Sequence, residues 1–152
     1  MGIMCSILTT TLAFANNAQF IAKDHIVIDL QSGVEWLRCS VGQRWDGAQC
    51  VGEIVKLNQE MSVQAIELAD EQLGGNWRLP TREELENIVC HECSRPKIDA
   101  SIFPNTPAEP FWTGEQNKYS PRHVWSVNFF IGHTYGRFMP FQDLVIRLVR
   151  DR

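Results

Sequence analysis

The feature that most constrains the fold of this chain is the placement of its cysteines, which fall into two pairs. Cys39 and Cys50 bracket the turn-rich segment GQRWDGAQ, and Cys90 and Cys93 form the segment CHEC. A fifth cysteine, Cys5, lies near the start of the chain. Disulfides persist only in oxidising compartments, so the state of these thiols depends on where the chain folds.

The N-terminal segment MGIMCSILTTTLAFA has the composition of a secretory signal. It carries no charge, is mostly apolar or small, and ends in the small-x-small pattern Ala13-Phe14-Ala15 that a signal peptidase reads. The apolar run is too short to span a bilayer, and no later segment is long enough. We therefore predict a signal peptide over residues 1–15, with an incomplete basic region, and an exported protein of the periplasm, the cell surface or the medium.

Removal of residues 1–15 leaves four cysteines, an even number that is typical of disulfides in an exported chain. Zinc-binding cysteines usually lie two to four residues apart. Redox cysteines lie close together at a helix N-terminus. Cys39 and Cys50 fit neither pattern, so we predict a structural disulfide, whose loop closure stabilises the fold by about 3 kcal/mol.

The CHEC segment allows several interpretations. Cys90 lies at the end of an expected helix, the wrong pole of the helix dipole for an activated thiolate. A zinc site would need two further ligands that no spacing rule supplies. We favour a Cys90–Cys93 disulfide, with a redox pair, a metal site and free thiols as the alternatives.

Residues 16–152 suffice for one domain with its own core. The hydrophobic fraction, 44%, is ordinary for a globular protein, and the net charge of −4 argues against nucleic-acid binding. No repeat, low-complexity run or flexible linker divides the chain.

The order of expected elements indicates the α+β class. HIVIDL (25–30) and GVEWLRC (33–39) are predicted to form a hairpin. Further strands are expected at FWTG (111–114), HVWSVNFF (123–130) and LVIRLVR (144–150). In the last of these, alternate residues face opposite ways.

Two helices are expected between these strands. The first follows Ser62 as its cap and ends at Gly74, with a repeating apolar pattern at three- to four-residue spacing. That pattern consists of Val63, Ile66, Ala69 and Leu73. The second begins with the capping box of Thr81 and Glu84 and buries Leu85, Ile88 and Val89. Prolines make the chain after Cys93 irregular.

Six blocks in this order carry a resemblance to a known family: GQRWDGAQCVG, NWRLPTREELENIV, RPKIDASIFPNTP, FWTG, HVWSVNF and VIRLVR. The chain resembles, over residues 28–150, the secreted bacterial family typified by the C-terminal domain of the collagen-like adhesin Lcl. This resemblance implies a C-type-lectin-like fold, related to that of formylglycine-generating enzymes. In such a fold the first and last strands pair, two helices flank the sheet, and the irregular middle faces the ligand.

The resemblance also implies binding of sulfated polysaccharides, a role in adhesion, and a trimer. The present sequence contains no collagen-like Gly-x-y tract, so the oligomeric state stays open. No cofactor or metal is expected. The calcium-ligand sets of sugar-binding C-type lectins are absent, because Glu109-Pro110-Phe111 and Trp125-Ser126-Val127 stand in their places.

An enzymatic function is not expected. The chain contains no Ser-His-Asp pattern, phosphate loop or HExxH motif, and no cysteine after Cys93 for formylglycine-type chemistry. Glu83, Glu84 and Glu86 resemble an acid/base cluster but are the charged first turn of a helix.

The expected ligand site lies between residues 112 and 142, where basic and aromatic side chains gather in a globally acidic protein. Arginine and lysine attract sulfate or carboxylate groups there. The candidate residues are Lys118, Tyr119, Arg122, His123, His133, Tyr135 and Arg137. Solvated loop residues are the plain alternative.

The tryptophans are expected to divide between core and surface. Trp36, Trp77, Trp112 and Trp125 have apolar strand neighbours and are predicted to be core, while Trp45 is predicted to be partly exposed.

Two functions remain. The first is an exported, non-catalytic module that binds an anionic glycan or a surface partner. The second is a structural subunit that docks on a larger envelope assembly without binding sugar.

Overall fold

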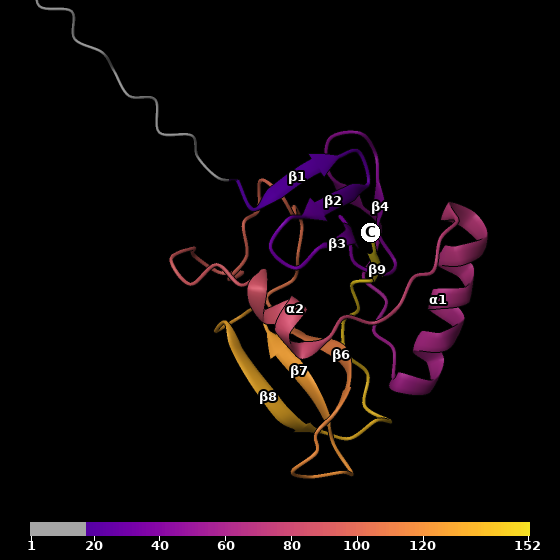
Figure 1. Ribbon diagram of the computed structural model, residues 1–152, viewed down its shortest axis with the longest axis vertical. Coiled ribbons are helices and arrows are strands. Elements are labelled where there is room, and N and C mark those ends of the chain that lie inside the picture. Colours follow the sequence, from indigo (N-terminus) through magenta and orange to yellow (C-terminus); the bar gives the residue numbers. More distant parts are fainter. Residues whose placement is uncertain (1–17) are drawn as a thin grey trace, which may run out of the picture.

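The computed structural model describes residues 18–152, so the predicted signal peptide lies outside the described residues. It contains two helices and three antiparallel sheets within that range, which confirms the α+β class (Figure 1). The elements in chain order are β1 (Phe20–Lys23), β2 (Ile26–Asp29), β3 (Val34–Leu37), β4 (Arg44–Trp45), β5 (Cys50–Val51), α1 (Gln59–Leu73), α2 (Arg82–Asn87), β6 (Pro110–Gln116), β7 (Val124–Asn128), β8 (His133–Phe138) and β9 (Val149–Asp151).

The terminal sheet has the strand order β1-β2-β3-β9 and joins both ends of the described chain. Its β2–β3 pair confirms the predicted hairpin, in which Val27 lies opposite Trp36. The expected pairing of the first and last strands is wrong, because β9 pairs with β3, placing Val149 opposite Trp36. Short connections keep β1, β2 and β3 adjacent, which leaves one free edge on β1 and one on β3, and the C-terminal strand pairs with β3.

The hairpin sheet, β6-β7-β8, lies below α2 in Figure 1, with the terminal sheet above. Apolar side chains from both sheets and from α2 meet in the first core cluster. Among its buried members are Val27, Trp36, Leu85, Phe111, Val127 and Val149. The second core cluster, which includes Leu57, Ala69, Trp77, Trp112, Ile146 and Leu148, joins α1 to the sheets.

Helix α1 begins earlier than the sequence pattern predicted. Asn58, not Ser62, is its N-cap, and the Asn58 side chain accepts a hydrogen bond from the Met61 N–H at 2.8 Å. Ser62 is buried inside the helix, where its Oγ donates to the Gln59 carbonyl. The predicted end at Gly74 is confirmed, with a φ of 68°.

The apolar stripe predicted for this helix is only partly correct. Ala69 is buried and Ile66 packs against the second core cluster, but Val63 and Leu73 are about half exposed. Ala65, Ile66 and Ala69 form the side of the helix that packs on the second core cluster, so Val63 and Leu73 are left partly open to solvent.

Helix α2 has the predicted capping box. The Thr81 hydroxyl accepts from the Glu84 N–H, and the Glu84 carboxylate accepts from the Thr81 N–H at 2.7 Å. Leu85 and Ile88 are buried, and Val89 is partly buried against the first core cluster. The segment from Cys93 to Glu109 that follows has neither helix nor strand, as expected from its prolines.

The segment 144–150 is not the long strand predicted, since only β9 at its end is regular. The predicted alternation is correct, but both sides are buried. Val145 belongs to the first core cluster, whereas Ile146 and Leu148 belong to the second. The segment therefore runs between two clusters, and its carbonyls accept hydrogen bonds from Trp112 on one side and Val41 on the other.

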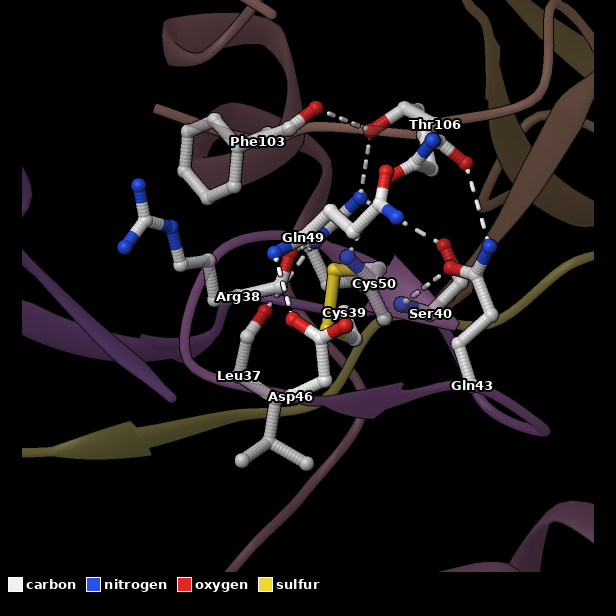
Figure 2. Close-up of a disulfide and its surroundings, with 12 residues drawn as sticks. Leu37, Arg38, Cys39, Ser40, Gln43, Asp46, Gln49, Cys50, Phe103 and Thr106 are labelled. Atoms are coloured by element: carbon white, nitrogen blue, oxygen red, sulfur yellow. Dashed lines mark hydrogen bonds between the residues drawn. A yellow bond between two sulfur atoms is a disulfide. The ribbon is translucent and has the colours of Figure 1, made fainter. Parts of the chain in front are cut away.

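Both disulfides are present. Cys39–Cys50 links the end of β3 to β5, with its Cα atoms 5.5 Å apart (Figure 2). Cys90–Cys93 closes the CHEC segment. Trp36, Trp77 and Trp112 are buried as predicted, and Trp45 is partly exposed as predicted. Trp125 differs from the prediction because it is only partly buried, with the Arg82 guanidinium 4.8 Å above its ring.

Candidate functional site

The seven predicted ligand residues all lie on the hairpin sheet or on the loop that joins two of its strands. Lys118, Tyr119, Arg122 and His123 belong to the loop that joins β6 to β7, at the lower tip of the molecule in Figure 1. His133, Tyr135 and Arg137 belong to β8, which was not predicted as a strand.

The β6–β7 loop is held by hydrogen bonds centred on the buried side chain of Asn117. Its Nδ2 donates to the Gly136 carbonyl at 2.8 Å, and its Oδ1 accepts from the Tyr119 N–H at 3.0 Å. The Ser120 hydroxyl lies 2.7 Å from the Nδ1 of His123. These contacts give the loop one defined shape before any ligand arrives, which lowers the entropic cost of binding.

Charged and aromatic groups project from this fixed loop. Lys118 and Arg122 are exposed, and Tyr119 is 93% exposed. Across residues 18–152, neither Lys118 nor Arg122 forms an ion pair. A nearly bare aromatic ring on the same loop as two cations without ion pairs is an unusual surface for a chain whose net charge is −4.

The nearest acidic residue in the sequence is engaged elsewhere. Glu115 accepts a hydrogen bond from the backbone N–H of Arg82, the first residue of α2, at 2.5 Å. An acidic side chain at this position stabilises the helix N-terminus. Glu115 therefore serves α2 and does not pair with the cations of the loop.

The pairing of β7 with β8 brings Arg137 to the same end of the sheet. Val124 lies opposite Phe138, and Asn117 bonds the carbonyl of Gly136 next to Arg137. The structure thus brings five of the seven predicted residues together. We call these residues the basic end: Lys118, Tyr119, Arg122, His123 and Arg137.

His133 is not part of this group. It lies opposite Asn128 at the other end of β8, four residues from Arg137, a distance of about 13 Å along a strand. Any ligand that touches both must be longer than a single sugar ring.

His133 and Tyr135 line a separate depression of about 470 Å³, which we call the aromatic hollow. Tyr135 is about half exposed, and its ring meets that of Phe138 edge to face at a centroid distance of 5.1 Å. Phe138 in turn packs against the buried Trp112. The hollow therefore has a supported aromatic wall that can contact the apolar face of a sugar ring.

Some residues of this surface were missed by the sequence analysis. Pro110, Asn128 and Phe138 also line the aromatic hollow. Phe141, in the segment after β8, is 74% exposed. The segment HTYGRF has no run of alternating polar and apolar residues, so the sequence carried no strand signal there.

The family model of the Lcl C-terminal domain matches residues 25–150. The chain belongs to the Lcl C-terminal domain family. No curated protein and no solved structure matches it.

The family match extends over most of this Lcl C-terminal domain. It spans the chain from the residue before β2 into β9, and includes both disulfides, the basic end and the aromatic hollow. Neither helix in the described part of the domain is long and apolar enough to cross a membrane.

Proposed function

We propose that this Lcl C-terminal domain is an exported, non-catalytic module that binds an anionic polysaccharide, sulfated or acidic, in adhesion. The observation that carries the proposal is the basic end. There a hydrogen-bonded loop exposes Tyr119 together with Lys118 and Arg122, while Glu115, the nearest acidic residue in the sequence, contacts α2.

The chemistry of the basic end suits sulfate or carboxylate groups on a sugar chain. The planar guanidinium of Arg122 or Arg137 donates two parallel hydrogen bonds to such a group. Lys118 adds a point charge, and Tyr119 offers an apolar face to the ring between anionic groups. A chain that continues along β8 reaches the aromatic hollow, where Tyr135 repeats this apolar contact.

The experiment is binding of the exported protein to immobilised heparin, with uncharged dextran as the control ligand. The triple variant Lys118→Glu, Arg122→Glu, Arg137→Glu is expected to lose binding, and the triple alanine variant to weaken it less, because reversal adds repulsion to the lost attraction.

A matched charge control separates a site from net charge. Lys23, Arg44 and Arg152 are exposed outside the hairpin sheet, so their reversal to glutamate gives the same net charge. This control is expected to retain most of the binding. Equal loss in the basic-end reversal variant and in this control, or full binding by the basic-end reversal variant, would contradict the proposal. Failure of the parent protein to bind heparin would favour a docking subunit that binds no sugar.

We also propose that the α+β arrangement is a C-type-lectin-like fold. Supporting features are the shared terminal sheet and the irregular segment 94–109 between α2 and the hairpin sheet. A crystal structure with a sulfated oligosaccharide tests this, because a ligand bound far from the irregular segment and the hairpin sheet would argue against it.

A further inference from the structure

A cleft of about 410 Å³ lies between α1 and the segment that contains β4, away from the basic end. One wall includes Leu37, Val41 and Trp45. The other wall is α1, which contributes Ala65, Leu68 and Leu73. Clefts of this size with mainly apolar walls are typical binding sites.

The wall opposite α1 is rigid. The Cys39–Cys50 disulfide closes the loop that contains Val41 and Trp45 (Figure 2). The Val41 N–H donates to the Ile146 carbonyl, and the Val41 carbonyl accepts from the Val55 N–H. Gly42 has a φ of 94°, and a Cβ there would overlap the backbone carbonyl of Glu53. The cleft is therefore preformed and does not need a ligand to shape it.

The α1 wall is apolar where it meets solvent. Leu68 is 51% exposed and Leu73 is 46% exposed, and both lie at the cleft. A surface helix normally turns such side chains towards the core. These two leucines instead leave apolar area uncovered beside an open cleft.

The charge of α1 indicates the chemistry of a partner that would bind there. The helix contains Glu60, Glu67, Asp70 and Glu71 but no lysine or arginine, and no ion pair involves these carboxylates in the described part of the chain. Glu67 and Glu71 flank Leu68 in a shallow depression on the helix. The far rim of the cleft carries the opposite charge, with Arg44.

We infer that α1 and its cleft form a docking site for a basic, apolar segment of a partner protein. Apolar side chains of that segment enter the cleft beside Leu68, and its lysines or arginines face Glu67 and Glu71. The cationic far rim sets the orientation, since it repels the basic side of the segment. An anionic glycan does not suit this surface, so the site is distinct from the basic end and does not rest on glycan binding.

The test uses a fluorescent peptide made only of leucine and lysine at amphipathic helical spacing, with fluorescence anisotropy measured at about 0.15 M salt. The exported protein is expected to bind it. Leu68→Ser and the pair Glu67→Lys, Glu71→Lys are each expected to weaken binding at least tenfold. These side chains are exposed, so the variants keep the fold, as circular dichroism will verify.

Matched control variants and a second peptide test whether the cleft selects a basic, apolar segment. Val63→Ser on another side of α1 and the pair Glu83→Lys, Asp143→Lys away from the cleft are expected to bind as the parent does. The basic-end triple variant should also bind normally, which keeps this test independent of glycan binding. Failure of the leucine–lysine peptide to bind, or equal binding of a leucine–glutamate peptide, would overturn the inference.

A second copy of the chain is the remaining occupant. Sedimentation of the protein alone is expected to give a monomer–oligomer balance that Leu68→Ser does not alter. Self-association that disappears in Leu68→Ser would assign the cleft to another copy and overturn the inference.

Discussion

Arg147 is a fully buried cation near the centre of the protein. Its guanidinium donates to the carbonyls of Leu37 and Arg38 and to the Thr106 hydroxyl at 2.7 Å, and within residues 18–152 it has no carboxylate partner. The ring of Phe103 lies 4.9 Å from it. Burial lowers the pKa of Arg147 to about 9, so the side chain remains charged at neutral pH.

We expect Arg147→Ala to lower the free energy of unfolding by about 3–5 kcal/mol. The substitution leaves buried acceptors without donors and opens a cavity beside Phe103. Arg147→Lys should be intermediate, since its ammonium has only three donors and no planar face. Urea unfolding measures both. An Arg147→Met variant as stable as the parent would contradict this expectation and show that the desolvation cost of the cation offsets the stabilisation from its hydrogen bonds.

The carboxylate of Glu84 makes the free energy of unfolding depend on pH in the acidic range. Burial acts to raise the pKa of Glu84, but the Arg78 hydrogen bond and the Thr81 N–H outweigh it, and the pKa lies below its ordinary value of 4.5. The folded state therefore binds the proton less readily than the unfolded chain. The stability from this carboxylate is present above about pH 4.5 and is lost as pH falls through the folded pKa.

We predict that the free energy of unfolding of Glu84→Gln depends less on pH in the acidic range than that of the parent. Its free energy of unfolding should be lower than that of the parent at neutral pH, and the difference should shrink below pH 4.5. Chemical denaturation at several pH values measures this. A difference that does not change with pH would mean that Glu84 acts by packing alone.

At the scale of the element, α2 depends on its N-terminal cap. Thr81→Ala is expected to cost about 0.5–2 kcal/mol, because the Glu84 N–H loses its acceptor. Thr81→Ser keeps the hydroxyl and serves as the control. Heparin binding should be unchanged in both variants, and a binding loss without a stability loss would make Thr81 a ligand residue.

The two disulfides should differ in their contribution to stability. Replacing Cys39 and Cys50 by alanine is expected to cost about 2–5 kcal/mol, as for small secreted domains. The same change at Cys90 and Cys93 should cost less, because the loop they close is much shorter. Thermal unfolding of the two double variants tests the order, and a larger loss for Cys90 and Cys93 would contradict it.

At the scale of the whole molecule, charge is divided between surfaces. The basic end carries cations without ion pairs in the described part of the chain, whereas the charged residues of α1 are all carboxylates. Figure 1 shows the β6–β7 loop at the lower tip of the molecule and α1 at its right side. Exposed charges act over about 8 Å at physiological salt. An anionic ligand is therefore attracted at one surface without being repelled by the other.

This separation predicts a steep salt dependence of heparin binding. Affinity should fall between low and physiological salt, and a chelator should have no effect, because no calcium-ligand set was found in the sequence. Tyr119→Ala and Tyr135→Ala should weaken binding even at high salt, since their contacts are apolar. Surface plasmon resonance at stepped salt measures this, and salt-independent binding would speak against an anionic ligand.

Some features of this fold could be predicted from the sequence because they depend on interactions between residues close together in the chain. The β2–β3 hairpin, the Thr81 capping box and the end of α1 at Gly74 each depend on neighbouring residues. The spacing of Cys39 and Cys50 excluded other chemistry once export was inferred. The resemblance to the Lcl C-terminal domain likewise came from six short blocks, and the family match agrees with it.

Other features were decided only by tertiary structure. The segment 144–150 alternates like a strand, yet it is buried on both sides because two clusters flank it. Helix α1 leaves Leu68 and Leu73 uncovered, which no periodicity reveals. The register of β7 and β8 places Arg137 at the same end of the sheet as Lys118. The same register places His133 at the opposite end. Long-range pairing sets these distances, and residues so far apart in the chain carry no local signal of it.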